Sequence, residues 1–197
     1  MIIWLNGAFG SGKTTSAYEL KRRLPNSFVY DPENIGYFIR ENIPKELHKS
    51  NFQDHAHWRT FNYEMLKYIA DTYNGTIIVP MTIFNPQYYE EIIQKLIDNG
   101  HSVRHYILYA DKSTLLKRLN KRLERGETWT KSQIDRCIQV FNTEITEEKI
   151  ITDNKRMDTV VDEIAKRSKI SLLPDKRTSL KKWVDRVIVL MKHIRLK

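Results

Sequence analysis

The segment Gly7-Ala8-Phe9-Gly10-Ser11-Gly12-Lys13-Thr14 constrains this chain more than any other feature. It satisfies the pattern G-x-x-x-x-G-K-[S/T], in which successive backbone N–H groups converge on phosphate oxygens. The apolar run Met1–Asn6 precedes it and the helix-like run Lys13–Leu24 follows it. This strand, loop and helix context is the one that a phosphate-binding loop requires. The opening segment therefore predicts a nucleoside triphosphate site.

Each residue type in this loop has a physical role. We expect Lys13 to reach the outer phosphates and the Thr14 hydroxyl to bind Mg²⁺, while Thr15 supplies a phosphate contact or is an ordinary helix residue. A dinucleotide-binding Rossmann site is excluded, because its G-x-G-x-x-G pattern fails after Gly12. The predicted contacts to ATP are Gly7, Ala8, Phe9, Gly10, Ser11, Gly12, Lys13, Thr14 and Thr15.

The net charge of the chain is concentrated at one end. The 197 residues carry a formal charge of +9, of which residues 174–197 contribute +6 through eight Lys/Arg and two Asp. A nucleic-acid groove would need basic residues spread over the body, so nucleic acid is disfavoured as a partner. We expect one nucleotide-binding domain over residues 1–173 and a basic amphipathic C-terminal helix in residues 174–197.

Cysteine content and hydropathy indicate the compartment. The single Cys137 cannot form an internal disulfide, which favours a reducing environment. No leader peptide is visible and no apolar run reaches transmembrane length. These features predict a cytoplasmic protein, with peripheral contact to a membrane as an open alternative.

Strand-like and helix-like segments alternate along the chain. This order predicts an α/β fold of the P-loop NTPase type, with a five-stranded parallel sheet flanked by helices. The expected strands are Met1–Asn6, Phe28–Tyr30, Thr76–Pro80, Val103–Tyr109 and Lys149–Thr152. The expected helices are Lys13–Leu24, Glu33–Arg40, His55–Tyr73, Gln87–Asp98, Ser113–Arg125, Lys131–Phe141, Met157–Lys169 and a final helix after the linker at residues 172–175.

Ligands of parallel sheets bind at the carboxyl ends of the strands. Asp31 follows the second expected strand, where a carboxylate could accept a proton from a substrate hydroxyl or hold Mg²⁺ through water. Its alternative role is to form the turn before Pro32. The third strand ends in Met81-Thr82 and offers no acidic residue to the metal. Thr82 is therefore a weak substrate-contact candidate, and Asp111 and Asp153 stand at the last two strand ends.

Arginines on one helix face suggest a lid over residues 111–137. Arg118, Arg122 and Arg125 have i, i+4 and i+7 spacing. Such arginines can neutralise charge on a transferring phosphoryl group, although most charge runs form a solvated face. We select Arg122 and Arg118 as catalytic candidates beside Lys13 and Asp31. Arg40 and Arg59 are weaker candidates for acceptor binding.

The C-terminal segment is strongly amphipathic. Its apolar set is Leu180, Trp183, Val184, Val187, Ile188, Met191 and Ile194, and its basic residues lie opposite. A helix of this kind either packs its apolar face on the sheet or lies on an anionic membrane.

Several longer strings resemble the bacterial tunicamycin-resistance ATP-binding proteins. They are the opening segment Met1–Thr14, Val29–Glu33, Phe61–Tyr63, Ile78–Ile83, Thr114–Leu119, Gln133–Cys137, Thr152–Asn154 and His193–Arg195. The resemblance runs in order along nearly the whole chain. It implies an ATP-binding P-loop fold related to small-molecule kinases, resistance to a nucleoside antibiotic and association with a membrane. In the wider kinase group the carboxylate after the second strand is often catalytic, which transfers to Asp31 alone.

Two functions follow as expectations. The first is an ATP- and Mg²⁺-dependent phosphotransferase acting on a small hydroxylated molecule or antibiotic. The alternative is a non-catalytic, ATP-gated protein that binds the drug at a membrane surface, which the missing carboxylate after Thr76–Pro80 favours.

Overall fold

A five-stranded sheet forms the centre of the protein. The computed structural model describes residues 1–121, 126 and 128–193. The strands are β1 (Ile2–Asn6), β2 (Ser27–Val29), β3 (Thr76–Pro80), β4 (Val103–Tyr109) and β5 (Glu148–Ile151). They pair in the order β2-β3-β1-β4-β5, and all four pairings are parallel. The predicted five-stranded parallel sheet is confirmed, and β1 with its following loop lies at its middle.

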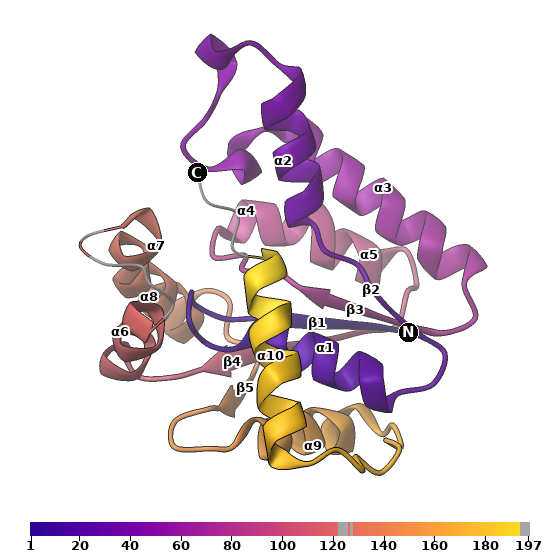
Figure 1. The fold of residues 1–197 in the computed structure, drawn as a ribbon. Coiled ribbons are helices and arrows are strands. Elements are labelled where there is room, and N and C mark those ends of the chain that lie inside the picture. The colour runs from indigo at the N-terminus through magenta and orange to yellow at the C-terminus, as the bar shows by residue number, and fades with distance from the viewer. Residues whose placement is uncertain (122–125, 127, 194–197) are drawn as a thin grey trace.

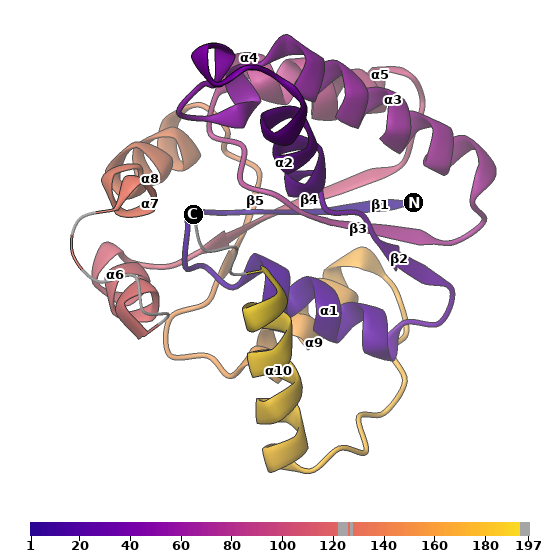
Figure 2. The same cartoon turned by 45° about the horizontal axis from the view of Figure 1, so that its top comes forward.

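Helices cover both faces of the sheet, as Figures 1 and 2 show. One face carries α1 (Lys13–Arg23), α9 (Met157–Ser168) and α10 (Ser179–His193). The other carries α2 (Glu33–Asn42), α3 (Ala56–Thr72), α4 (Pro86–Tyr89) and α5 (Lys95–Asp98). Beyond the carboxyl ends of the strands lie α6 (Lys112–Lys121), α7 (Trp129–Ser132) and α8 (Ile134–Thr143).

The residues of β1 explain why the sheet needs both layers. All five are buried. Ile2 and Trp4 contribute to the core under α3 and α8, whereas Ile3 and Leu5 contribute to the core under α1 and α9. This alternation of apolar residues on both faces is typical of a parallel sheet sandwiched between helices.

The structure refines several expected helices. The segment expected as Gln87–Asp98 contains a π-helical stretch, η3 (Glu90–Gln94), between α4 and α5. Short 3₁₀ turns, η1 (Lys45–Leu47) and η2 (Phe52–Asp54), fill the region before α3. Helix α6 is described to Lys121, so the predicted continuation to Arg125 lies outside the described residues. The helix expected from Lys131 is divided into α7 and α8.

Helix α10 does not pack its apolar face on the sheet, which was one of the two expected arrangements. Its polar side faces α1 and α9, where Arg186 contacts Glu19 and Asp158. Much of its apolar set points away, with Leu180 70% and Met191 69% exposed. Packing of the apolar face on the sheet is therefore wrong, because the acidic side chains of α1 and α9 attract the basic side of the helix. Within the described part of the chain, no helix combines the length and apolarity needed to cross a bilayer.

Candidate functional site

The phosphate-binding loop connects β1 to α1 at the middle of the sheet. Gly7 has φ +136°, and a Cβ there would collide with the carbonyl oxygen of Leu108. Gly12 has φ +102° and caps the N-terminus of α1 in the left-handed region. Glycine is the residue that adopts these angles without strain. The loop therefore brings its backbone close to a neighbouring strand and directs the positive end of α1 into the site.

Side chains beneath the loop hold it in place. The Asn6 carboxamide accepts hydrogen bonds from the N–H groups of Gly7 (2.8 Å) and Ile83 (2.9 Å), and donates one to the Ile83 carbonyl (2.8 Å). The Thr82 hydroxyl donates to the Gly7 carbonyl at 2.9 Å. Thr82, expected as a weak substrate contact, thus supports the loop from the end of β3. Asn6 is not recognisable as a functional residue from the sequence, because its contacts to Ile83 depend on the pairing of β1 with β3.

The residues expected to contact ATP lie together. The Lys13 ammonium donates to the carbonyl oxygens of Gly7 (3.0 Å) and Ala8 (3.2 Å), which keeps the cation inside the curve of the loop. The Ser11 hydroxyl is buried and has no hydrogen-bond partner among the described residues. Thr14 lies in the first turn of α1, beside Lys13. A triphosphate would supply the acceptors that Ser11 lacks, and the Thr14 hydroxyl is a suitable oxygen ligand for Mg²⁺.

Asp31 lies at the carboxyl end of β2, on the same edge of the sheet as the loop. One of its carboxylate oxygens accepts a hydrogen bond from the N–H of Glu33 at 3.0 Å, and so supports the start of α2. Burial, and then the Asp31 charge, raise the pKa of Tyr30 and of Tyr18, which follows Thr14 on α1. The negative field of Asp31 therefore extends to the helix that follows the phosphate loop.

Arg118 joins α6 to the loop. Its guanidinium donates to the Thr152 carbonyl (2.7 Å) and hydroxyl (3.0 Å), and weakly to the Gly10 carbonyl (3.4 Å). Burial lowers its pKa, and the charge of Asp153 opposes this effect. Arg118 thus lies against the far side of the loop from β3. Arg122, the other catalytic candidate of this face, lies outside the described residues.

Arg40 and Arg59 both contact backbone in the described structure. Arg40 donates to the carbonyl of Ser50 at 3.0 Å and lies over the Phe52 ring. Arg59 is buried, donates to the Gln53 carbonyl at 2.7 Å and stacks on Tyr88 at 4.4 Å. Both arginines therefore shape the segment that leads through η2.

That segment lines a polar pocket of about 240 Å³, which two of its lining residues, Gln53 and Trp129, connect to the loop region. Gln53 links the pocket to the phosphate site, since its carboxamide donates to the Thr82 carbonyl at 2.8 Å. Trp129 of α7 closes it from the lid side and packs edge-on against Phe9 of the loop at 5.5 Å. The polar side chains that line it are Ser50, Asn51, Gln53, Asp54, Asn85, Tyr88, Gln133 and Arg136.

Sequence reasoning missed most of this pocket. Its residues come from η2, from the start of α4 and from the lid helices, which meet only in the folded chain. Trp129, Gln133 and Arg136 lay in the predicted lid, but the sequence did not indicate that they line a pocket. Arg59 was predicted to contact the acceptor, but it does not line the pocket. It contacts two residues that do, Gln53 and Tyr88.

A second cavity, of about 330 Å³, lies on the other side of the loop. It is bounded by Gly12, Arg118, Met157 and Leu190 among others. Nearby, the last two strand ends are joined, because the Asp153 carboxylate accepts a hydrogen bond from the N–H of Asp111 at 3.2 Å. The phosphate loop is thus flanked by a polar pocket and by a cavity with apolar walls.

Solved structures share this architecture. The tunicamycin resistance protein of Deinococcus radiodurans is 29% identical, with 88% of this chain and 99% of that chain covered and a TM-score of 0.74. A sugar kinase of Janibacter sp. is 18% identical, with 86% and 95% covered and a TM-score of 0.59. The deoxyadenosine kinase of M. mycoides is 18% identical, with 86% and 99% covered and a TM-score of 0.55.

The two kinases establish the fold type alone, which is that of P-loop small-molecule kinases. No curated protein matches the sequence. Residues 2–143 match a family described as an AAA domain. The fold is the P-loop, kinase-like fold of the solved structures. Since the family match spans more than half of the chain and includes the phosphate loop, the protein belongs to that AAA-domain family.

Proposed function

We propose that this protein is an ATP- and Mg²⁺-dependent phosphotransferase that acts on a small hydroxylated molecule. The observation that supports it best is the pair of pockets on either side of the phosphate loop. Phosphoryl transfer requires the attacking and leaving oxygens to lie roughly in line, so a kinase needs space on both sides of the transferred group. The polar pocket provides space for an acceptor on one side of that group.

In this reaction each predicted site residue has a separate role. Lys13 and the loop N–H groups hold the phosphates, and Asp31 accepts the proton of the attacking hydroxyl. Arg118, together with Arg122, neutralises charge that develops on the transferring group. Mg²⁺ held by Thr14, and by Asp31 through water, would supply further charge neutralisation.

The polar pocket favours an acceptor rich in hydroxyl groups. Carboxamides at Asn51, Gln53 and Asn85 can both donate and accept hydrogen bonds, as an uncharged polyol requires. The Trp129 ring adds an apolar surface on the lid side. Because the related structure from D. radiodurans is that of a tunicamycin resistance protein, tunicamycin is the first acceptor to test.

The deciding experiment is mass spectrometry of tunicamycin after incubation with ATP, Mg²⁺ and the protein. We expect the antibiotic to gain one phosphoryl group and ADP to accumulate. The Lys13→Ala variant is the control, since a contaminating kinase would leave its product unchanged. A screen of sugars and nucleosides for ADP release extends the test. Nucleotide binding without ADP release in every case would contradict catalysis.

A second function is favoured by the exposed apolar side of α10. In this second function the protein binds and sequesters the antibiotic at a membrane surface when ATP is bound, and transfers no phosphoryl group. Trp183 is 63% and Met191 69% exposed, which is unusual for large apolar residues of one helix. Because Lys182 and Arg186 contact carboxylates of the protein itself, apolar insertion rather than charge would carry the membrane contact.

Co-sedimentation with anionic vesicles, with and without ATP, tests this alternative. We expect Trp183→Glu to lower the bound fraction severalfold. The matched control is Phe38→Glu, because Phe38 is 60% exposed on α2, away from α10. If the intact protein stays in the supernatant in all conditions, the membrane proposal is wrong.

A further inference from the structure

The cavity next to Gly12 is placed where the base of a nucleotide must lie. The acceptor pocket occupies the side of the loop near Phe9 and Thr82. In-line transfer puts the leaving nucleotide on the opposite side of the transferred phosphoryl group. That side is the 330 Å³ cavity beyond Gly12, which falls within the usual range for small-ligand sites.

The walls of this cavity suit a planar aromatic ring. Arg118 is held by its hydrogen bonds to Thr152 and lies at the phosphate-loop end of the cavity, next to the Gly10 carbonyl. Met157 also lines the cavity, and its Sδ accepts a hydrogen bond from the Ser16 hydroxyl at 3.2 Å, next to the loop. Val160, also on α9, is 2% exposed and gives the cavity an apolar floor.

The remaining wall comes from the C-terminal helix. Leu190 of α10 lines the cavity, although it is separated from Gly12 by most of the chain. Its neighbour Val189 is 6% exposed against the body of the protein. The nucleotide cavity is therefore complete only while α10 lies against α1 and α9, the arrangement that Figures 1 and 2 show.

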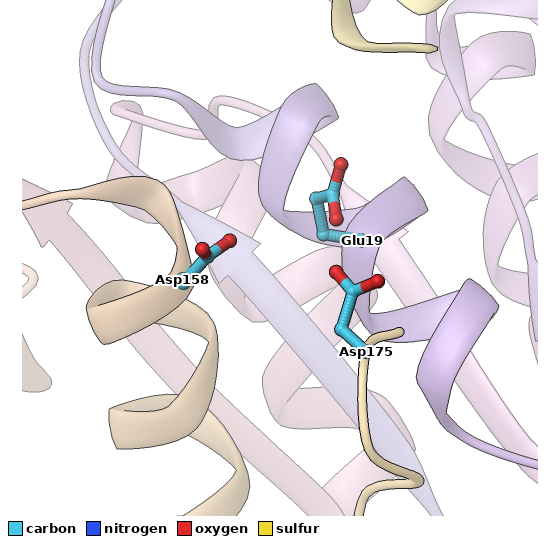
Figure 3. A group of neighbouring side chains, drawn as sticks. All are labelled: Glu19, Asp158 and Asp175. Carbon is cyan, nitrogen blue, oxygen red and sulfur yellow. The ribbon is translucent and has the colours of Figure 1, made fainter. Parts of the chain in front are cut away.

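Three carboxylates hold α10 in this position. Glu19, Asp158 and Asp175, which we call the acidic clasp, converge from α1, α9 and the segment before α10 (Figure 3). Lys182 contacts Asp158 at 3.1 Å and Asp175 at 3.2 Å. Arg186 contacts Glu19 at 3.1 Å and also binds Asp158.

These ion pairs are partly shielded from solvent. The Glu19 side chain is only 2% exposed, so solvent screens its partners weakly. Arg177 adds contacts to Glu19, Asp175 and Asp185 from the chain just before α10. The cations that position the helix thus neutralise the acidic clasp. Without them, three neighbouring carboxylates would repel one another at a partly buried site.

We propose that Leu190 is a base-contacting residue and that the acidic clasp positions it, so that the C-terminal helix forms part of the nucleotide site. This inference rests on the proposed ATP binding. Leu190 contacts the base, whereas Lys182 and Arg186 act through the position of the helix. The exposed apolar side of α10 takes no part in this role.

Calorimetric titration of the full chain with Mg·ATP and with inorganic tripolyphosphate tests the proposal. We expect Leu190→Ala to weaken ATP binding about fivefold and to leave tripolyphosphate binding unchanged, because only ATP carries a base. Leu180→Ala is the matched control, since it removes the same atoms from the exposed side of α10. Arg186→Ala, which loosens the helix, should weaken ATP binding in the same selective way.

The outcomes distinguish a failure of ATP binding from a failure of the role of Leu190. If wild-type protein binds neither ligand, the proposed function itself fails. If it binds both and Leu190→Ala matches wild type, ATP binding stands and the role of Leu190 is wrong. An equal loss of both ligands in Leu190→Ala would also overturn the inference, because the helix would then support the loop and not the base.

Discussion

At the scale of single residues, Lys13 is the only cation inside the described phosphate loop. It donates to two loop carbonyls, Gly7 and Ala8, so its position is fixed by the loop itself. We predict that Lys13→Ala weakens Mg·ATP binding by about 100-fold, the value of one or two charge-assisted hydrogen bonds. Calorimetry measures this directly. Lys21→Ala, an exposed lysine on the same helix, should bind as wild type does.

Asp31 combines a structural contact with the proposed chemistry, and Asp31→Asn separates the two. The asparagine oxygen can still accept the hydrogen bond from the Glu33 N–H, so the start of α2 and the fold should persist. The general base is lost, which typically lowers turnover by about 10²–10⁴-fold. Once an acceptor is known, steady-state kinetics with a parallel ATP titration check this. Normal turnover in the variant would remove Asp31 from catalysis.

At the scale of elements, the sequence pattern predicted those strands and helices whose bounds depend on neighbouring residues. The strand Val103–Tyr109 was predicted to the residue, because an apolar run between turns leaves little freedom. The orientation of α10 was not predictable, since its amphipathic pattern does not say which side meets the protein. That choice depends on Glu19, which is placed by α1, far away in the sequence. The polar pocket was missed for the same reason, as η2 and α7 meet only in the folded chain.

Strand β4 contains a buried titratable group whose effect on stability can be tested. His105 is 8% exposed, stacks on Tyr89 at 5.6 Å, and neither ring nitrogen has a hydrogen-bond partner among the described residues. Burial lowers its pKa from 6.5 to about 3. Between pH 6.5 and 3, the unfolded chain protonates this histidine and the folded protein does not. We therefore predict that His105 does not lower the free energy of unfolding above pH 6.5. As the pH falls from 6.5 toward 3, it lowers that free energy by up to about 1.4 kcal/mol per pH unit.

Urea denaturation at a series of pH values checks this prediction. His105→Phe should lose that component of the acid sensitivity, because phenylalanine cannot take up a proton. His57→Gln, which changes an exposed histidine at the start of α3, should keep it. Identical pH profiles for wild type and His105→Phe would show that the buried ring does not govern acid stability.

At the scale of the whole molecule, the uneven charge of the sequence acquires a structural reason. Lys182 and Arg186 of this segment contact carboxylates of α1 and α9, so that part of its positive charge compensates acidic side chains of the body. In this arrangement the helix is attached mainly by ion pairs, and it adds little to the apolar core. The same arrangement leaves an apolar surface exposed, which is the feature that a purely structural helix would bury.

Deletion of residues from Ser179 onward tests this arrangement. A helix packed by its apolar side would expose core surface when removed, and the remaining chain would aggregate. Here the deletion removes the exposed Leu180, Trp183 and Met191 and breaks the ion pairs of the acidic clasp. We therefore predict a folded protein that is at least as soluble and about 1–3 kcal/mol less stable, since the broken pairs are only partly buried. Its ATP affinity should fall severalfold, through loss of Leu190, while tripolyphosphate binding is retained. Urea denaturation, light scattering and calorimetry measure these three properties, and aggregation of the shortened chain would contradict the orientation of α10 described above.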